Sequence, residues 1–385
     1  MNHTIFNTLD QLNSFQWIIL GLFILVFVVR LYYQLFYESR WLFSNRKAVI
    51  ANEKTTEPVS VLLTVRNEEE NLKRILPQLL TINNVKYEAI AVDDYSLDNT
   101  YAVLGSFRQK YSHFKISSLN EETRFSVKLA QNIALKAAQY EWVLLLPVDA
   151  SEVNNDWLSG FSRNTATRNR NLLLGYTGIA PHQGWYNLLY RIENYRQQTK
   201  SAGFILNGIP FVYSEENVAF KRHEYFKLGG YGQQTREAYA NLELLINKFM
   251  TKKETAVLFN ETTCLIKQYI TGKEEFLNLL RRSFRIEKHL PAWKRFFITA
   301  EAISKVLYLP AFILALLLIT DLWMVSMGLS ILLLVVQMII MKIGQKRLNE
   351  RKIFIPSLVY GLLIPYYQLF VRWNFSRLSR RKNGR

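Results

Sequence analysis

The sequence at residues 87–100, YEAIAVDDYSLDNT, joins an apolar run to an acidic turn and then to a candidate helix start at Thr100. The run at 87–92 is short and apolar, which is typical of a buried strand. Residues 59–65, VSVLLTV, form a similar run earlier in the chain. Residues 68–80, between the two runs, carry apolar positions at helical spacing. Strand, helix and strand in this order predict a parallel sheet.

This alternation continues to residue 146. Residues 114–117 and 142–146 are further candidate strands, and residues 127–139 form a candidate helix. We therefore predict an α/β domain with helices on both faces of a mostly parallel sheet. Ligands of such domains bind at the carboxyl ends of the strands. The polar residues directly after the strands are the candidate site residues: Arg66, Asn67, Glu68, Asp93, Asp94 and Asp149.

The composition excludes several classes of protein. The chain has 385 residues, and its 49% of hydrophobic and 14% of aromatic residues exceed what disordered chains contain. Cys264 is the only cysteine, so a disulfide-stabilised secreted domain is excluded. The net charge of +17 is typical of proteins that bind nucleic acid, an anionic membrane or an anionic substrate. Residues 342–385 hold 11 Lys or Arg and one acidic residue, so we expect the charge to mark a membrane face and expect no nucleic-acid partner.

The apolar residues gather at the two ends of the chain. Residues 17–29 are uninterrupted and, with the apolar residues that follow, reach the roughly 20 residues that cross a bilayer. Basic residues follow this segment and none precede it, which predicts an N-terminus outside and residue 40 onward in the cytoplasm. Residues 306–320 and 322–341 form a candidate helical hairpin across a Thr-Asp break, and a basic loop follows them. These segments predict transmembrane helices on both sides of the α/β domain.

A last apolar segment covers residues 353–371 and holds two prolines, Pro356 and Pro365. It is long enough to span a membrane, but a fourth span would place the basic tail outside, against the positive-inside rule. A re-entrant hairpin or an interfacial helix would keep the tail inside. Both alternatives remain open at this point.

Several motifs resemble the family 2 glycosyltransferases of the GT-A fold. VSVLLTVRNE at 59–68 is similar to the family's V-S-V-I-I-P-x-x-N-E, and YEAIAVDDYSLDNT is similar to E-V-I-V-V-D-D-x-S-x-D-x-T. In the family these two loops hold the nucleotide of a sugar-nucleotide donor. The resemblance assigns that role to Thr64, Arg66, Glu68, Asp93 and Asp94. For the first loop, a simple helix start with Asn67 as the cap is the alternative interpretation.

Two further residues carry the expected diphosphate and metal sites. Lys128 matches a helix lysine of the family pattern K-x-A-x-N, which can neutralise a diphosphate, although a solvent-exposed helix lysine would look the same. Asp149 matches the first aspartate of the family's metal-binding D-x-D, and Ser151 stands at the second position. The resemblance therefore implies Mg²⁺ or Mn²⁺ at Asp149 and Ser151, with Glu152 as an alternative ligand. One carboxylate and one hydroxyl make a weaker site than two carboxylates.

The acceptor side is less regular. Asn217 and the residues after it resemble the family pattern G-x-N-x-A-Y-x-R-x-x-F, which precedes the general base. The base position falls on Asn241, an amide that cannot take a proton. Glu243 is the nearest carboxylate and the candidate base, with Glu237 in reserve. A general base contributes about 10²–10⁴ in rate, so this departure matters.

Residues 272–290 occupy the place of the family's Q-x-x-R-W motif. Arg281 or Arg282 matches the arginine and is a candidate contact to the donor diphosphate. The segment is also amphipathic, which predicts a helix on the cytoplasmic surface of a membrane. Both interpretations are kept.

The expected organisation is a transmembrane anchor at 1–40, a GT-A domain at 55–265, amphipathic interface helices at 266–302, and a transmembrane region with a basic tail at 303–385. The resemblance implies an inverting glycosyltransferase in the bacterial inner (cytoplasmic) membrane, with its catalytic domain in the cytoplasm. It would move a sugar from a nucleotide-diphosphate donor, expected to be a UDP-sugar, to a lipid-linked or polysaccharide acceptor.

The departures at Ser151, Asn241 and the Q-x-x-R-W motif leave one alternative. The protein would then be a non-catalytic GT-A protein that binds a nucleotide sugar or a partner synthase at the membrane.

Overall fold

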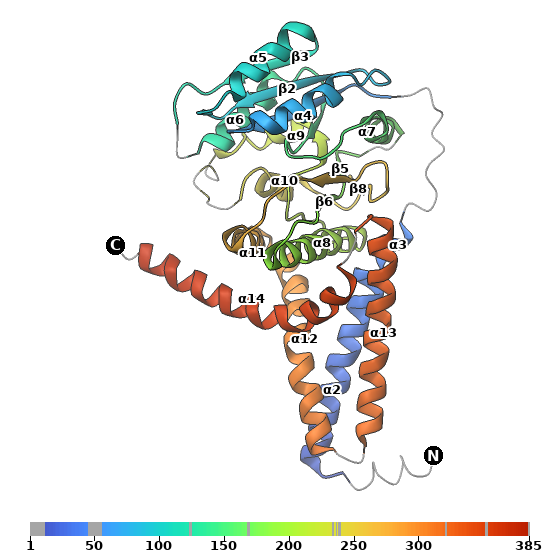
Figure 1. The fold of residues 1–385 in the computed structure, drawn as a ribbon. Helices are drawn as coiled ribbons and strands as arrows, with labels where there is room; N and C mark the ends of the chain where they lie inside the picture. The colour runs from blue at the N-terminus through green and yellow to red at the C-terminus, as the bar shows by residue number, and fades with distance from the viewer. Residues whose placement is uncertain are drawn as a thin grey trace. The chain divides into compact units, whose positions relative to one another are not determined.

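The computed structural model divides the chain into two compact units (Figure 1). It describes residues 12–44, 56–122, 125–167, 170–232, 235, 237, 240–319, 322–350 and 353–383. One unit consists of Met1–Leu42, Leu290–Lys346 and Arg351–Arg385, and the other consists of Phe43–His289 and Arg347–Glu350.

In the described part of the chain, the second unit contains a seven-stranded sheet in the order β3-β2-β1-β4-β7-β5-β8. The strands are β1 Val59–Val65, β2 Tyr87–Asp93, β3 Phe114–Ser118, β4 Trp142–Leu145, β5 Leu172–Leu174, β7 Val218–Lys221 and β8 Thr255–Val257. Strands β1 to β4 run parallel to one another, and β7 runs antiparallel to β4 and β5. The predicted strands and the mostly parallel sheet are confirmed. A separate parallel pair joins β6 Thr177–Ile179 to β9 Leu265–Lys267.

The described part of this unit also contains helices that pack on the sheet or on one another. They are α4 Glu69–Leu80, α5 Thr100–Lys110, α6 Ser126–Ala137, α7 Asn155–Thr167, α8 Trp185–Leu206, α9 Arg222–Lys227, α10 Glu243–Phe249 and α11 Lys273–His289. In α4, the four residues Leu72, Ile75, Leu76 and Leu79 have no exposed surface and belong to the same core cluster as β1. Their i, i+3, i+4, i+7 spacing places them on one face of the helix, as the sequence predicted.

The loops after β1 and β2 are hydrogen-bonded to each other. Asn67 lies in the left-handed region with a φ of 54°, and its side chain accepts a hydrogen bond of 2.8 Å from the backbone N–H of Leu97. The backbone N–H of Glu68 donates to the hydroxyl of Thr100 at 2.8 Å. The N-cap of α4 is Glu68 and not Asn67, so the simple capping interpretation of Asn67 was wrong. Asn67 instead ties the two motif loops together.

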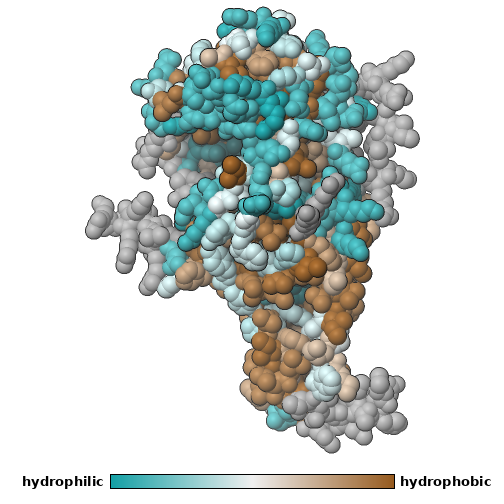
Figure 2. All heavy atoms as spheres, viewed as in Figure 1, coloured by the Kyte–Doolittle hydropathy of each residue, from teal (hydrophilic) through white to brown (hydrophobic). Residues whose placement is uncertain are grey.

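The first unit is helical. It holds α2 Ser14–Tyr32 with its continuation η1 Tyr33–Glu38, followed by α12 Ala292–Leu318, α13 Trp323–Arg347 and α14 Phe354–Asn383, while the short α3 Arg40–Phe43 ends at the boundary between the units. Among the described residues, four helices are long and apolar enough to cross a membrane. Phe23 of α2 packs against Ala311 and Ala315 of α12, and the outward surface of these helices is apolar (Figure 2).

The last apolar segment forms one helix. α14 continues through Pro365 without ending there. The predicted Thr-Asp break at 320–321 lies outside the described residues.

One buried asparagine connects the start of β7 to other segments of the domain through hydrogen bonds. Asn217 precedes β7, has no exposed surface and has a φ of 56°. Its amide group donates to the carbonyl oxygens of Tyr176 at 2.9 Å and Thr263 at 2.8 Å, and its amide oxygen accepts from the indole N–H of Trp157 at 3.0 Å. Asparagine tolerates the left-handed region better than most residues, so it meets both requirements.

Replacing this residue tests its structural role. We expect Asn217→Ala to lower the free energy of unfolding by more than about 3 kcal/mol, because two carbonyls and one indole N–H lose their partners. Denaturant unfolding of the detergent-purified protein, followed by tryptophan fluorescence, measures the change. The matched control is Asn84→Ala, because the exposed Asn84 side chain makes one hydrogen bond of 3.5 Å. Equal stability of the two variants would contradict the assignment.

Candidate functional site

The register of the parallel strands places the first residues of the candidate site. Val65 pairs with Asp93 in the parallel β1–β2 ladder, and Leu62 pairs with Leu145 in the parallel β1–β4 ladder. The carboxyl ends of the three strands therefore share one edge of the sheet. The residues that follow them, including Asp94 and Asp149, lie along that edge.

The two aspartates after β2 have different surroundings. The Asp93 carboxylate accepts hydrogen bonds from the backbone N–H of Ser96 at 3.3 Å and from its hydroxyl. Asp93 thus stabilises the turn. Asp94 is buried, and its backbone N–H donates to the carbonyl of Val65 at 2.7 Å. The charge of Asp94 acts on the guanidinium of Arg66, which also pairs with Glu122 at 2.5 Å.

Glu68 connects this end of the site to Asp149. Its carboxylate accepts from the side-chain amide of Asn71 at 2.6 Å. Burial raises the pKa of Glu68 above its ordinary value, and the negative charge of Asp149 adds to the increase. The two carboxyl groups therefore lie within electrostatic range of each other.

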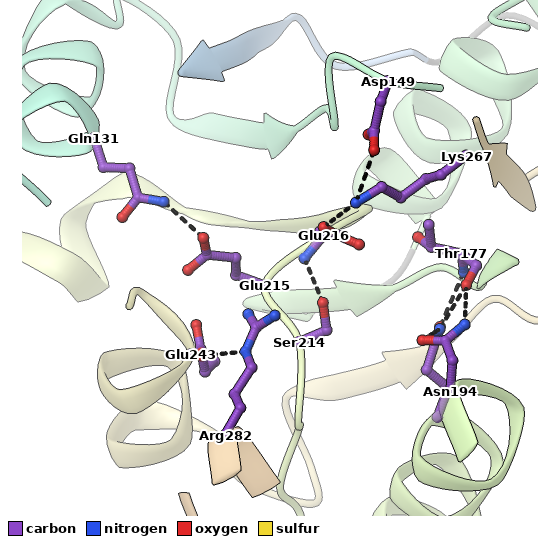
Figure 3. Close-up of polar contacts among 11 residues, drawn as sticks. Gln131, Asp149, Thr177, Asn194, Ser214, Glu215, Glu216, Glu243, Lys267 and Arg282 are labelled. Atoms are coloured by element: carbon purple, nitrogen blue, oxygen red, sulfur yellow. Dashed lines mark hydrogen bonds and ion pairs between the residues drawn. The ribbon is translucent and has the colours of Figure 1, made fainter. Parts of the chain in front are cut away.

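Two later strands bring further charges to Asp149 (Figure 3). β7 is antiparallel to β4, so Glu216, just before β7, lies at the carboxyl end of β4. Lys267 is the last residue of β9 and is bridged to Ala150, next to Asp149. The Lys267 ammonium lies 3.3 Å from the Asp149 carboxylate and 2.5 Å from that of Glu216.

This ion-pair cluster is largely shielded from water. The side chains of Lys267, Asp149 and Glu216 are 9%, 12% and 30% exposed. Burial works against the charged form of Lys267, but Glu216 and Asp149 outweigh it and raise the lysine pKa above its ordinary value. Burial also raises the pKa of Asp149, and the Lys267 charge opposes that increase. Lys267 is thus held as a cation between two carboxylates.

A second buried cluster lies on the other side of the loop that carries Glu215 and Glu216 (Figure 3). Glu243 is the first residue of α10, its side chain has no exposed surface, and Arg282 of α11 donates to it at 2.6 Å. Glu215 accepts from Gln131 of α6 at 2.7 Å and from the backbone N–H of Leu242 at 2.6 Å.

The two glutamates of this second cluster differ in ionisation. Burial favours the neutral form of both. For Glu243 the Arg282 charge outweighs burial and lowers the pKa below its ordinary value. For Glu215 burial and the neighbouring Glu243 charge raise the pKa well above it. The two neighbouring carboxyl groups are therefore shifted in opposite directions.

The remaining predicted residues divide between the site and its surroundings. Lys128 is buried and donates to the backbone carbonyls of Thr235 at 3.1 Å and Glu237 at 2.6 Å, so it is not a solvent-exposed lysine. Thr64 lies half-buried in β1 opposite Val92. Arg281 donates to Asn278 at 2.9 Å, away from the Glu243 pair.

The two departures from the base and metal motifs also have defined places. The carbonyl of Asn241 accepts from the backbone N–H of Leu244 at 3.2 Å, at the start of α10. The hydroxyl of Ser151 accepts from the side-chain amide of Gln268 at 3.1 Å. The reserve base Glu237 pairs with Arg285 at 3.4 Å and with His289 at 3.2 Å.

The donor set near Asp149 does not fit a divalent cation. Its nearest carboxylates already surround the Lys267 ammonium, and the residue at the second D-x-D position offers a hydroxyl. A dication at these carboxylates would have to displace the ammonium, which at about 4 Å would repel it by roughly 8 kcal/mol at an effective dielectric constant of about 20, against its attraction to the carboxylates. Among the described residues, no group of three or more His, Cys, Asp or Glu side chains could hold a metal ion.

Sequence reasoning missed Lys267, Glu215 and Glu216. Lys267 follows a short apolar run, CLI, without any charge pattern around it, so no local signal marked it. The two glutamates stand directly before Asn217 in a motif that the resemblance had already located. Adjacent acidic residues between apolar segments were the signal that could have found them.

Comparison with known proteins identifies the domain. Residues 60–226 match the model of the family described as "Glycosyl transferase family 2". This segment is a family 2 glycosyltransferase domain. The resemblance predicted from the motifs is confirmed.

Two curated relatives of this glycosyltransferase domain come from Staphylococcus epidermidis, and each is a poly-beta-1,6-N-acetyl-D-glucosamine synthase. One is 26% identical over 175 residues, which cover 39% of this chain and 42% of the relative. The other is 28% identical over 144 residues, which cover 34% of each chain. The matched part thus spans less than half the length of either relative.

A solved structure shows the same fold. It is a mannosyltransferase from Pyrobaculum calidifontis in complex with GDP-Man and Mn²⁺, with a TM-score of 0.52 and 17% identity over 90% of this chain and 99% of that chain. The likeness supports the predicted GT-A fold of the glycosyltransferase domain.

The ion pair between α10 and α11 gives a stability prediction. We expect Arg282→Gln to lower the free energy of unfolding by about 3–5 kcal/mol, because it leaves the Glu243 carboxylate buried without a counter-charge. The double variant Arg282→Gln/Glu243→Gln should recover most of the loss. Denaturant unfolding at neutral pH measures both.

Arg281→Gln is the matched control, because Arg281 is the neighbouring residue on the same helix and contacts Asn278 and Glu274 of that helix. A loss of stability in this control equal to that in Arg282→Gln would show that the buried pair is not responsible.

Proposed function

We propose that this protein is a membrane-bound glycosyltransferase that moves a sugar from a nucleotide-diphosphate donor to a lipid-linked or polysaccharide acceptor. The observation that carries the proposal is the meeting of the Asp94 loop and the Asp149–Lys267 cluster at one edge of a family 2 glycosyltransferase domain. A UDP-sugar is the proposed donor. The Staphylococcus relatives, named as polysaccharide synthases, support a glycan acceptor.

The residues have distinct proposed roles. Asp94, Arg66 and Glu68 would hold the nucleotide, because they lie where the first two strands end. Lys128 and Arg282 provide positive charge near the centre of the site, which would favour the leaving diphosphate. The reaction would be a single displacement at the anomeric carbon, with inversion, in which the acceptor hydroxyl loses its proton to a base.

Glu243 is the proposed base, by its position in the sequence motif. Its carboxylate is buried and accepts from Arg282, so this ion pair has to open before Glu243 can take a proton from an acceptor. This observation favours a second candidate function, in which the domain binds a nucleotide sugar without transferring it.

The four apolar helices support a place in the membrane. We propose a multi-pass protein of the bacterial inner (cytoplasmic) membrane with the glycosyltransferase domain in the cytoplasm. Basic residues follow the first apolar helix and a basic loop follows the third, and the positive-inside rule places such segments in the cytoplasm.

Transfer of label from a panel of radiolabelled nucleotide sugars to lipid or polymer, in membranes that contain the protein, tests the main proposal. We expect Asp94→Asn to weaken donor binding about tenfold or more, because a charge-assisted hydrogen bond contributes about 1.5–3 kcal/mol. Glu243→Gln should lower the rate about 10²–10⁴-fold while donor binding is retained.

Glu70→Gln is the control, because the Glu70 side chain is exposed and pairs only with Lys73 on the same helix. Donor binding with no transfer from any sugar in the panel would favour the non-catalytic function. If no nucleotide sugar binds, both functions are wrong.

A further inference from the structure

A lysine ammonium lies beside the aspartate that matches the family's metal-binding motif. The Lys267 ammonium lies 3.3 Å from the Asp149 carboxylate, which matches the first aspartate of the family's metal-binding motif. The second motif position holds Ser151 in place of a carboxylate, and the serine hydroxyl accepts a hydrogen bond from the side-chain amide of Gln268. The last residue of β9, Lys267, and the residue after it, Gln268, thus contact the two motif positions.

We propose that Lys267 replaces the divalent metal and that the site binds a nucleoside diphosphate without one. This inference rests on the proposed function, because it concerns how the same site meets the charge of its donor. Asp149 would position Lys267, and the ammonium would meet the phosphate oxygens.

The backbone holds this lysine firmly in place. The N–H of Gln268 donates to the carbonyl of Asp149 at 2.7 Å, and the N–H of Ser151 donates to the carbonyl of Ile266 at 2.6 Å. These two bonds surround the bridge between Ala150 and Lys267. The strand that carries Lys267 is therefore fixed to the motif loop on both sides of the lysine.

Further contacts set the position of this strand and the direction of the side chain. β9 pairs with β6, and β6 is joined to α8 through Thr177, whose carbonyl accepts from Asn194 at 2.8 Å and from Gln198 at 2.6 Å (Figure 3). The Lys267 ammonium also lies 5.0 Å from the centre of the Tyr269 ring, within the range of a cation–π contact. Carboxylates and an aromatic face thus enclose one permanent positive charge.

The carboxylates around Lys267 differ from those of an empty metal site. Lys267 carries one positive charge against Asp149 and Glu216. A metal-binding site leaves its carboxylates unpaired until the cation arrives, whereas these two are already paired. An ammonium can donate to phosphate oxygens as well as to carboxylates, so the same group can serve both states of the site.

Two measurements on the detergent-purified full-length protein test the inference. Calorimetry with UDP and GDP, in excess EDTA and in Mn²⁺, measures nucleotide binding. Electron paramagnetic resonance of Mn²⁺, without nucleotide, measures metal binding. For the wild type we expect the nucleotide affinity to change by no more than about threefold between the two conditions, and we expect no Mn²⁺ to bind at Asp149.

The variants test whether Mn²⁺ can take the place of the Lys267 ammonium. We expect Lys267→Met to lower nucleotide affinity in EDTA about tenfold or more. Lys267→Met/Ser151→Asp restores the two carboxylates of the motif without the ammonium, so it should bind Mn²⁺ and should bind nucleotide better with Mn²⁺ than with EDTA. Lys267→Arg keeps the charge and should remain insensitive to EDTA.

The outcomes separate this inference from the proposed function. Mn²⁺ bound by the wild type and lost in Asp149→Asn would overturn it, as would nucleotide binding that EDTA abolishes. If the wild type binds neither UDP nor GDP, the proposed function is wrong. Metal-free nucleotide binding is then wrong as well, and only the replacement of the metal by Lys267 is decided by Mn²⁺, which should bind the double variant and not the wild type. The wild-type measurements require no variant to fold.

Discussion

Buried carboxylates need buried cations, and this requirement organises the glycosyltransferase domain. Asp149 and Glu216 lie against Lys267, and Glu243 lies against Arg282. An ionised carboxylate that loses its partner in such surroundings is strongly destabilised. Both cations come from the end of the domain sequence, on β9 and α11. The late part of the domain must therefore close on the sheet before the acidic residues of the earlier part are compensated.

The same pairing of carboxylate and cation is found at the two departures from the family motifs. Where the second motif aspartate is replaced by Ser151, a lysine stands beside the first. The base position holds Asn241, and the Glu243 carboxylate two residues later forms an ion pair with an arginine. That arginine, Arg282, is one of the two that match the family's Q-x-x-R-W arginine. In both places a basic side chain compensates the charge of a neighbouring carboxylate.

The basic C-terminal region also has more than one role. Arg347, at the end of α13, belongs to the glycosyltransferase unit together with Glu350. Its guanidinium donates to the carbonyl of Phe259 at 3.0 Å. The Glu350 carboxylate accepts from the hydroxyl of Tyr176 at 2.7 Å and pairs with Arg191 at 3.1 Å. Part of the charge that the sequence assigned to a membrane face therefore stabilises the α/β domain.

The sequence by itself determined the strands and helices of the first half of the domain, because apolar spacing there follows the periods of strand and helix without interruption. It also determined the edge of the sheet that carries Asp94 and Asp149, since parallel strands place their carboxyl ends together. It did not reveal Lys267, which has no charged pattern around it, and it did not distinguish Arg281 from Arg282. Those choices were made by tertiary structure. The β9 bridge brings Lys267 to a residue more than 100 positions earlier, and the 100° turn between neighbouring helix residues points Arg282 and not Arg281 toward Glu243.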